Sequence, residues 1–142
     1  MKEQVMTYST AGQVNTAFWI MLVLNGLVFL LANMLFPMQI VLGTSAFSLW
    51  WALFHSSLII TLVGTLHIAQ FEWAQKNLLK RTMSNMEWML GYFVINFIGL
   101  WLITRVPEQF GLGVAHWWIL LLLAIALDFV QGMGMMLVYK KK

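Results

Sequence analysis

Residues 15–47, NTAFWIMLVLNGLVFLLANMLFPMQIVLGTSAF, lie within a run without any charged residue that extends from Gln4 to Phe71. The hydrocarbon core of a bilayer takes about 20 helical residues, so this run is too long for one membrane span. It is interrupted at residues 37–45, where proline and glycine disfavour a continuous helix. The run therefore predicts two spans, at about 15–36 and 47–70, joined by a short loop.

The second half of the chain contains two further apolar runs, at about 86–104 and 117–139. They are separated by RVPEQFGLGVAH, residues 105–116, whose proline and glycines predict a turn. Together the runs predict an all-α integral membrane protein, a four-transmembrane-helix bundle that forms a single membrane domain over residues 1–142.

The composition supports this fold class and excludes several functions. Hydrophobic residues make up 61% of the chain and charged residues 9%, against roughly 45–50% and about 25% in soluble domains. A small soluble fold cannot bury that much apolar surface, which excludes a soluble enzyme. The absence of cysteine excludes disulfides, iron–sulfur clusters and thiolate zinc sites. The net charge of +3 does not indicate a nucleic-acid partner, because the basic residues lie at the ends of the apolar runs.

Local patterns mark the predicted helix ends. Thr44 or Ser45 is expected to cap the second helix. Glu72 and Lys76 are spaced for contact along a helix, which favours a polar extension of the second span beyond the membrane surface. The first span lacks a small-residue cleavage pattern and is expected to remain as an anchor. Capping-box sequences precede the first and third spans: Thr10 with Gln13, and Ser84 with Glu87.

The distribution of basic residues predicts the orientation. With an even number of spans, seven basic residues share one side and Arg105 lies alone on the other. Because cytoplasmic loops carry the excess of Lys and Arg, both termini are expected to be cytoplasmic, N-in/C-in, in a bacterial inner membrane. Tryptophans near both predicted interfaces agree with this arrangement. The seven basic residues are Lys2, Lys76, Lys80, Arg81, Lys140, Lys141 and Lys142.

Asp128 is the one charged residue deep inside a predicted span. It lies eleven residues from both Trp117 and Tyr139, which at about 1.5 Å per residue places it close to the bilayer midplane. An ionisable group there costs about 2.5–3.5 kcal/mol on insertion scales, so we expect it to face the bundle interior. The small residues Ala124 and Gly132 lie one turn away on either side, which predicts close approach of a neighbouring helix.

Polar groups occur at a similar depth on every predicted span. We expect them to form a midplane polar cluster, a candidate ion or hydrogen-bond site. As a functional site the cluster would coordinate a cation or form one stop on a proton path. As a structural element it would fix helix register, which we favour because Asn and Thr do not titrate. The candidate members are Asp128, Gln131, Asn25, Asn96, Thr61 and His55.

Cofactor and metal chemistry have little support in the sequence. His55 and His67 share the second span, but a haem needs a histidine on a facing helix, and His116 lies at the outer surface. The chain contains 11 methionines, whose thioethers could bind a soft metal during transport, yet methionine also fills irregular gaps between apolar helices. There are no paired carboxylates and no nucleophile–base set at a common depth. We therefore predict no enzyme activity, no catalytic residue, no cofactor and no metal site.

These observations predict a non-enzymatic accessory or self-assembling helical subunit. The alternative is a small proton- or cation-coupled transporter or channel centred on Asp128. Because four helices enclose little interior, we expect a homo-oligomer or a larger membrane-protein partner within the lipid bilayer. Small residues are the expected helix-packing positions: Ala124, Gly132, Ser56 and Gly64.

Overall fold

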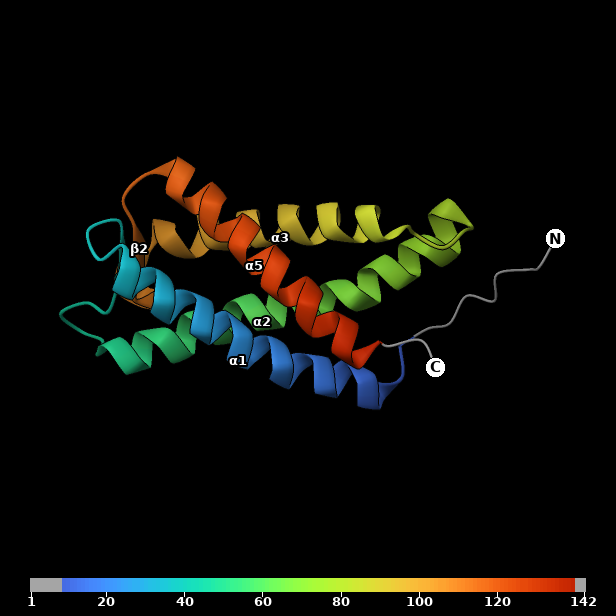
Figure 1. Cartoon of the computed structure of the whole chain (residues 1–142), viewed down its shortest axis with the longest axis horizontal. Coiled ribbons are helices and arrows are strands. Elements are labelled where there is room, and N and C mark those ends of the chain that lie inside the picture. Colours follow the sequence, from blue (N-terminus) through green and yellow to red (C-terminus); the bar gives the residue numbers. More distant parts are fainter. Residues whose placement is uncertain (1–8, 140–142) are drawn as a thin grey trace.

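The computed structural model describes residues 9–139. Its four long helices are α1 (Ala11–Leu35), α2 (Leu49–Ala74), α3 (Asn85–Arg105) and α5 (Trp117–Val138), shown in Figure 1. Each is long and apolar enough to cross a membrane, which confirms the four predicted helical runs. The predicted extension of the second helix is also present, because α2 continues into a π-helical segment, η1 (Gln75–Leu79).

The helices pack side by side as a bundle in which α1 contacts α2 and α5, while α3 contacts α5 and α2. Phe29, Leu100 and Leu127 are completely buried within the main apolar core. Many leucines point outward instead, and Leu66 is 63% exposed in the isolated chain. An apolar exterior of this kind is the surface that a lipid environment favours.

The helix starts confirm two of the three predicted caps. Both capping boxes are present, at the N-termini of α1 and α3. The expectation that Thr44 or Ser45 caps α2 is wrong: Ser48 is the cap, and its hydroxyl accepts a hydrogen bond from the Trp51 amide. The Thr44 hydroxyl instead accepts hydrogen bonds from two amides within the loop. The helix starts later because residues 43–47 form a loop that follows a short strand.

That strand, β1 (Ile40–Leu42), pairs antiparallel with β2 (Leu112–Val114). The pairing joins the α1–α2 loop to the α3–α5 loop, in which a short helix, α4 (Pro107–Phe110), precedes β2. Between α4 and β2, Gly111 has a left-handed φ of 79° and packs so closely on Ala52 that a Cβ would collide with it. The sequence predicted a turn here but not the sheet.

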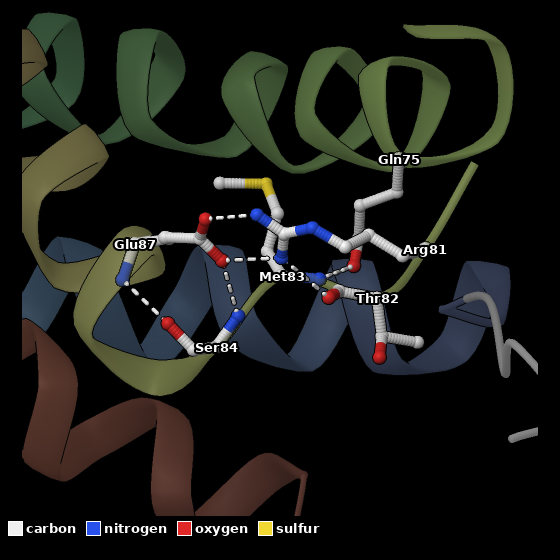
Figure 2. Close-up of polar contacts among 6 residues, drawn as sticks. All are labelled: Gln75, Arg81, Thr82, Met83, Ser84 and Glu87. Atoms are coloured by element: carbon white, nitrogen blue, oxygen red, sulfur yellow. Dashed lines mark hydrogen bonds and ion pairs between the residues drawn. The ribbon is translucent and has the colours of Figure 1, made fainter. Parts of the chain in front are cut away.

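At the opposite end of the bundle, the connector between η1 and α3 is held by polar contacts (Figure 2). Arg81 forms an ion pair with Glu87, and Glu87 also accepts a hydrogen bond of 2.7 Å from the Ser84 amide. The Gln75 side chain accepts a hydrogen bond of 2.7 Å from the Met83 amide. The pKa of the Arg81 guanidinium lies above its ordinary value, because this group forms hydrogen bonds to Glu87 and lies beside the negative charge of that carboxylate.

Candidate functional site

A hydrogen-bonded network in the bundle core contains one residue from each long helix. Asn25 of α1 donates to the Thr61 hydroxyl of α2 at 2.9 Å. The Gln131 side chain of α5 donates to the side-chain oxygen Oδ1 of Asn25 at 2.7 Å. The Asn96 side chain of α3 donates to the side-chain oxygen Oε1 of Gln131 at 2.9 Å. We call these four residues the core network, and none of them is more than 2% exposed.

The core network is closed by two further contacts. The Thr61 hydroxyl donates to the Ser57 carbonyl oxygen at 2.7 Å, within α2. The side-chain nitrogen Nε2 of Gln131 also lies 3.3 Å from the side-chain oxygen Oδ1 of Asn96, so these two side-chain amides pair in both directions. A buried polar group without a partner costs about 1–3 kcal/mol, so a rotation or slip of any one helix is penalised. Amides and hydroxyls do not titrate near neutral pH, and the arrangement is therefore suited to fixing helix register.

Asp128 lies beside the core network and forms no part of it. The inward-facing residues of α5 include Ala124, Leu127, Gln131 and Gly134, whose spacing of three and four residues defines one helix face. Asp128 is half-buried at the edge of that face. Within residues 9–139 it forms no hydrogen bond or ion pair. The prediction that it faces the interior is therefore not met in this structure.

His55 is also separate from the core network. Its Nδ1 lies 3.3 Å from the Trp51 carbonyl oxygen, and its ring packs against the Trp51 ring. His67 makes the equivalent contact with the Val63 carbonyl oxygen at 3.0 Å. Both imidazoles thus bind the backbone of their own helix. In the described part of the chain, no group of three or more His, Cys, Asp or Glu side chains is placed to hold a metal ion.

Three of the four predicted packing positions lie at contacts between elements. Ala124 and Ser56 are fully buried, and the Ser56 hydroxyl donates to the Phe110 carbonyl oxygen at 3.0 Å. Gly64 is buried where a Cβ would lie 3.7 Å from the sulfur of Met21. These small residues allow neighbouring elements to approach closely.

The fourth position, Gly132, is different: a Cβ there would meet no atom within 4 Å. Gly132 therefore packs against no other helix of this bundle, since it lies on the same edge of α5 as Asp128, and its role in helix contact stays a prediction. Gly134 makes such a contact within the bundle, since a Cβ would lie 2.5 Å from Leu24 of α1. The spacing from Gln131 would have predicted Gly134, which lies three residues further along the same helix face. The spacing from Asp128 pointed to Gly132 instead.

A shallow groove runs between α1 and α2 on the outside of the bundle. Its volume is about 330 Å³, and Gly26 and Ser57 lie among its lining residues. The Ser57 side chain is 2% exposed, and its hydroxyl has no hydrogen-bond partner in the described structure. We call this surface the α1–α2 groove; its remaining lining residues are Leu22, Val23, Leu27, Leu30, Trp50, Leu53 and Phe54.

Comparison with protein-family models, with curated proteins and with solved structures finds no match to this chain. The class of protein is therefore defined by the fold alone. It is a helical bundle with four helices apolar enough to cross a membrane, tied together by a buried, uncharged polar network.

Proposed function

We propose that this chain is a non-enzymatic helical subunit that associates with other helices inside a bilayer. The observation that carries the proposal is Asp128, a half-buried carboxyl without a partner within residues 9–139, on a helix whose amide side chain, Gln131, is already bonded within the core network. We further propose that both termini are cytoplasmic, in a bacterial inner membrane, on the basis of the excess of basic residues on one side.

The surroundings of Asp128 fit a contact with another helix. A carboxyl in the middle of a span costs about 2.5–3.5 kcal/mol on insertion scales, and a polar group from a second helix offsets part of this cost. One turn away, Gly132 leaves open space in which a second helix backbone can approach. We call Leu121, Asp128 and Gly132 the α5 flank; all three are half-buried in the isolated chain.

The core network supports the same proposal from inside the bundle. Its members are neutral, and their hydrogen-bonding groups are directed at one another. Such an interior stabilises one arrangement of helices and does not need to open. The Asp128 carboxyl on the α5 flank is in contrast a polar group that stays available for a contact outside the bundle.

The second candidate function is proton or cation translocation at Asp128. It is favoured by the same unpaired carboxyl, because a titratable group in the middle of a span is the usual requirement for a proton relay. The two functions differ in what Asp128→Asn does. The amide keeps a hydrogen-bonding group for assembly but cannot exchange a proton or neutralise a cation.

The test compares association and flux in the full-length protein in lipid. Mass measurements in nanodiscs formed at several protein-to-lipid ratios should show that wild-type chains associate. Gly132→Leu should reduce association about tenfold, the equivalent of about 1.4 kcal/mol, because the side chain blocks the approach of a second helix. Met133→Leu is the matched control, since Met133 is an exposed neighbour.

A wild-type protein that is monomeric at every ratio would refute the assembly proposal. Proteoliposome flux driven by a pH gradient tests the second candidate. Flux that is present in the wild type and lost in a folded Asp128→Asn variant would establish translocation in its place.

A further inference from the structure

We infer that the chain binds one anionic phospholipid on the outer face of α2, at the end of the bundle that carries the connector. The phosphate of the lipid pairs with the Lys76 ammonium, and its glycerol and upper acyl chains lie in a shallow hollow next to Trp73. The inference goes beyond the proposed function and does not depend on assembly at Asp128. We call this surface the α2 hollow; it is lined by Ala69, Gln70, Phe71, Trp73 and Ala74.

The α2 hollow is apolar, open to the outside and provided with one polar group. Its volume is about 540 Å³, and all of its lining residues belong to α2. Trp73 is 59% exposed, so the hollow opens to the exterior of the bundle. Two alanines and two aromatic rings make the lining apolar, and the exposed Gln70 adds one amide. The ester region of a phospholipid matches this lining, because it joins apolar chains to polar oxygens.

The α2 hollow lies at the depth where acyl chains meet headgroups. α2 and η1 form one helical rod, Leu49–Leu79, of 31 residues, which is about 46 Å long at about 1.5 Å per residue. A hydrocarbon core is about 30 Å thick, and a bilayer with its headgroups about 40–45 Å. The exposed Trp50 marks one interface, and the hydrocarbon ends about 20 residues further on, at Gln70. Lys76 lies about 9 Å beyond Gln70, at the level of the phosphates.

Lys76 follows the hollow directly along the helix. It lies three residues beyond Trp73, and residues at this spacing are neighbours on a helix surface. Its ammonium is carried on a flexible stem of four carbons, so it can reach a phosphate that lies over the hollow. Lysine binds phosphate as a point charge and needs no second donor in a fixed geometry.

The charge of Lys76 is not compensated within the described chain. Lys76 is exposed and forms no ion pair within residues 9–139. Glu72 lies four residues earlier, at a spacing that allows a pair. The Glu72 carboxylate instead accepts a hydrogen bond of 2.8 Å from the Ser9 amide, next to the start of α1. Glu87 pairs with Arg81 (Figure 2), so the charge of Lys76 is available to an anion from outside the chain.

Charge favours a lipid over a second copy of this chain as the occupant of the hollow. The connector, the helix ends beside it and the two ends of the sequence contain seven basic and three acidic residues. Copies inserted in the same direction would bring these basic segments close together, and like charges repel. Anionic lipids carry the opposite charge and are attracted to basic segments next to a membrane-spanning helix.

Native mass spectrometry of the full-length protein in detergent tests the inference. The probes are dioleoylphosphatidylglycerol, which is anionic, and dioleoylphosphatidylcholine, which has the same acyl chains but no net charge. We expect the wild type to bind one phosphatidylglycerol in preference to phosphatidylcholine. Lys76→Gln should reduce this preference about fivefold, as expected for the loss of one lysine next to an anionic lipid.

Lys80→Gln is the matched control, because it removes the same charge from an exposed residue one turn further from the hollow. This variant should keep the wild-type preference. An equal loss in both variants would overturn the inference, since it would show a diffuse attraction to the basic end and no defined site.

The role of the hollow is tested without a change in charge. Ala69→Leu fills the hollow at an exposed position, so the bundle should keep its wild-type melting temperature. Binding of phosphatidylglycerol should fall at least as much as in Lys76→Gln. Ala126→Leu, at an exposed alanine of α5, is the control and should bind as the wild type does. Unchanged binding in Ala69→Leu would refute the assigned site.

A soluble competitor separates a lipid from a free phosphate. Glycerophosphate carries the phosphate without acyl chains, and it should not displace the lipid at the same concentration. Displacement by glycerophosphate would show that the hollow contributes nothing to binding and would overturn the inference.

The lipid site and the proposed function can fail independently. Gly132→Leu, on α5, should keep the preference for phosphatidylglycerol while it reduces association. A wild type that binds both lipids equally would refute the lipid site and leave assembly untouched. A wild type that prefers phosphatidylglycerol but is monomeric at every protein-to-lipid ratio would support the lipid site and refute assembly.

Discussion

At the scale of single residues, Gln131 has the largest part in holding the helices in register. Its side-chain nitrogen donates to the Asn25 side chain and lies within hydrogen-bond distance of the Asn96 side chain, and its side-chain oxygen accepts a hydrogen bond from Asn96. One side chain of α5 thereby connects α1 and α3. Because the residue is 2% exposed, water is not available to replace these bonds.

Gln131→Leu is predicted to destabilise the bundle by about 1–3 kcal/mol, because Asn25 and Asn96 then lose buried hydrogen-bond partners. The measurement is the melting temperature in a mild detergent, with Met133→Leu as the exposed control on the same helix. Equal melting temperatures for the two variants would show that the network contributes no stability.

The two glycines near the end of α5 are predicted to respond in opposite ways. Gly134→Leu should destabilise the folded chain by about 1–3 kcal/mol, because the side chain collides with Leu24 and Ile20. Gly132→Leu should leave the melting temperature of the monomer unchanged, since nothing lies within 4 Å of its Cβ. Thermal unfolding of both variants in detergent checks this prediction, and it fails if Gly132→Leu is the less stable of the two.

At the scale of elements, the β1–β2 pair connects two loops that are far apart in the sequence. Beyond the strands, the Gly43 amide donates to the Gly111 carbonyl oxygen at 2.8 Å, and the Ala115 amide donates to the Gln39 carbonyl oxygen at 2.8 Å. This sheet fixes the end of α1 relative to the start of α5. The connector at the other end, with its Arg81–Glu87 pair, is more exposed.

Gly111→Ala is predicted to destabilise the fold by about 1–3 kcal/mol, because a side chain is strained at a positive φ and also meets Ala52. Gly113→Ala is the matched control: its Cβ would be in ordinary contact with Val41 at 4.0 Å. Thermal unfolding should therefore separate the two variants. A Gly113→Ala variant that melts as low as Gly111→Ala would show that the strands, and not the turn, set the stability.

At the scale of the whole molecule, the even number of long helices brings both ends of the described chain to the connector end of the bundle (Figure 1). The β-sheet, α4 and Arg105 lie at the other end, where the Arg105 guanidinium is 4.8 Å from the centre of the Trp101 ring. In a membrane these two ends must face opposite compartments. The excess of basic residues predicts that the connector end is cytoplasmic.

This orientation is tested with single cysteines at exposed positions. In intact cells, a membrane-impermeant thiol reagent should label Glu108→Cys, near the sheet, and should not label Lys80→Cys, in the connector. Both should be labelled after the membrane is permeabilised, which controls for reactivity. Labelling of Lys80→Cys alone in intact cells would reverse the orientation.

The sequence by itself determined the number of long helices and most of their ends. Helix length follows from the apolar runs, and the caps at Thr10 and Ser84 use residues three positions apart, so both are local properties. Four of the six candidate cluster residues also lie together, because each is a polar residue at the same depth on its span.

Only the tertiary structure decided how each helix is rotated and how the loops pair. Spans that are apolar all round carry no periodic signal that distinguishes an inner from an outer face. For α5 that choice depends on contacts with other helices: Gln131 with Asn25 and Asn96, and Gly134 with Leu24. These contacts turn Gln131 inward and leave Asp128 at the edge. The β1–β2 pairing likewise joins residues distant in the chain, so no local pattern predicts it.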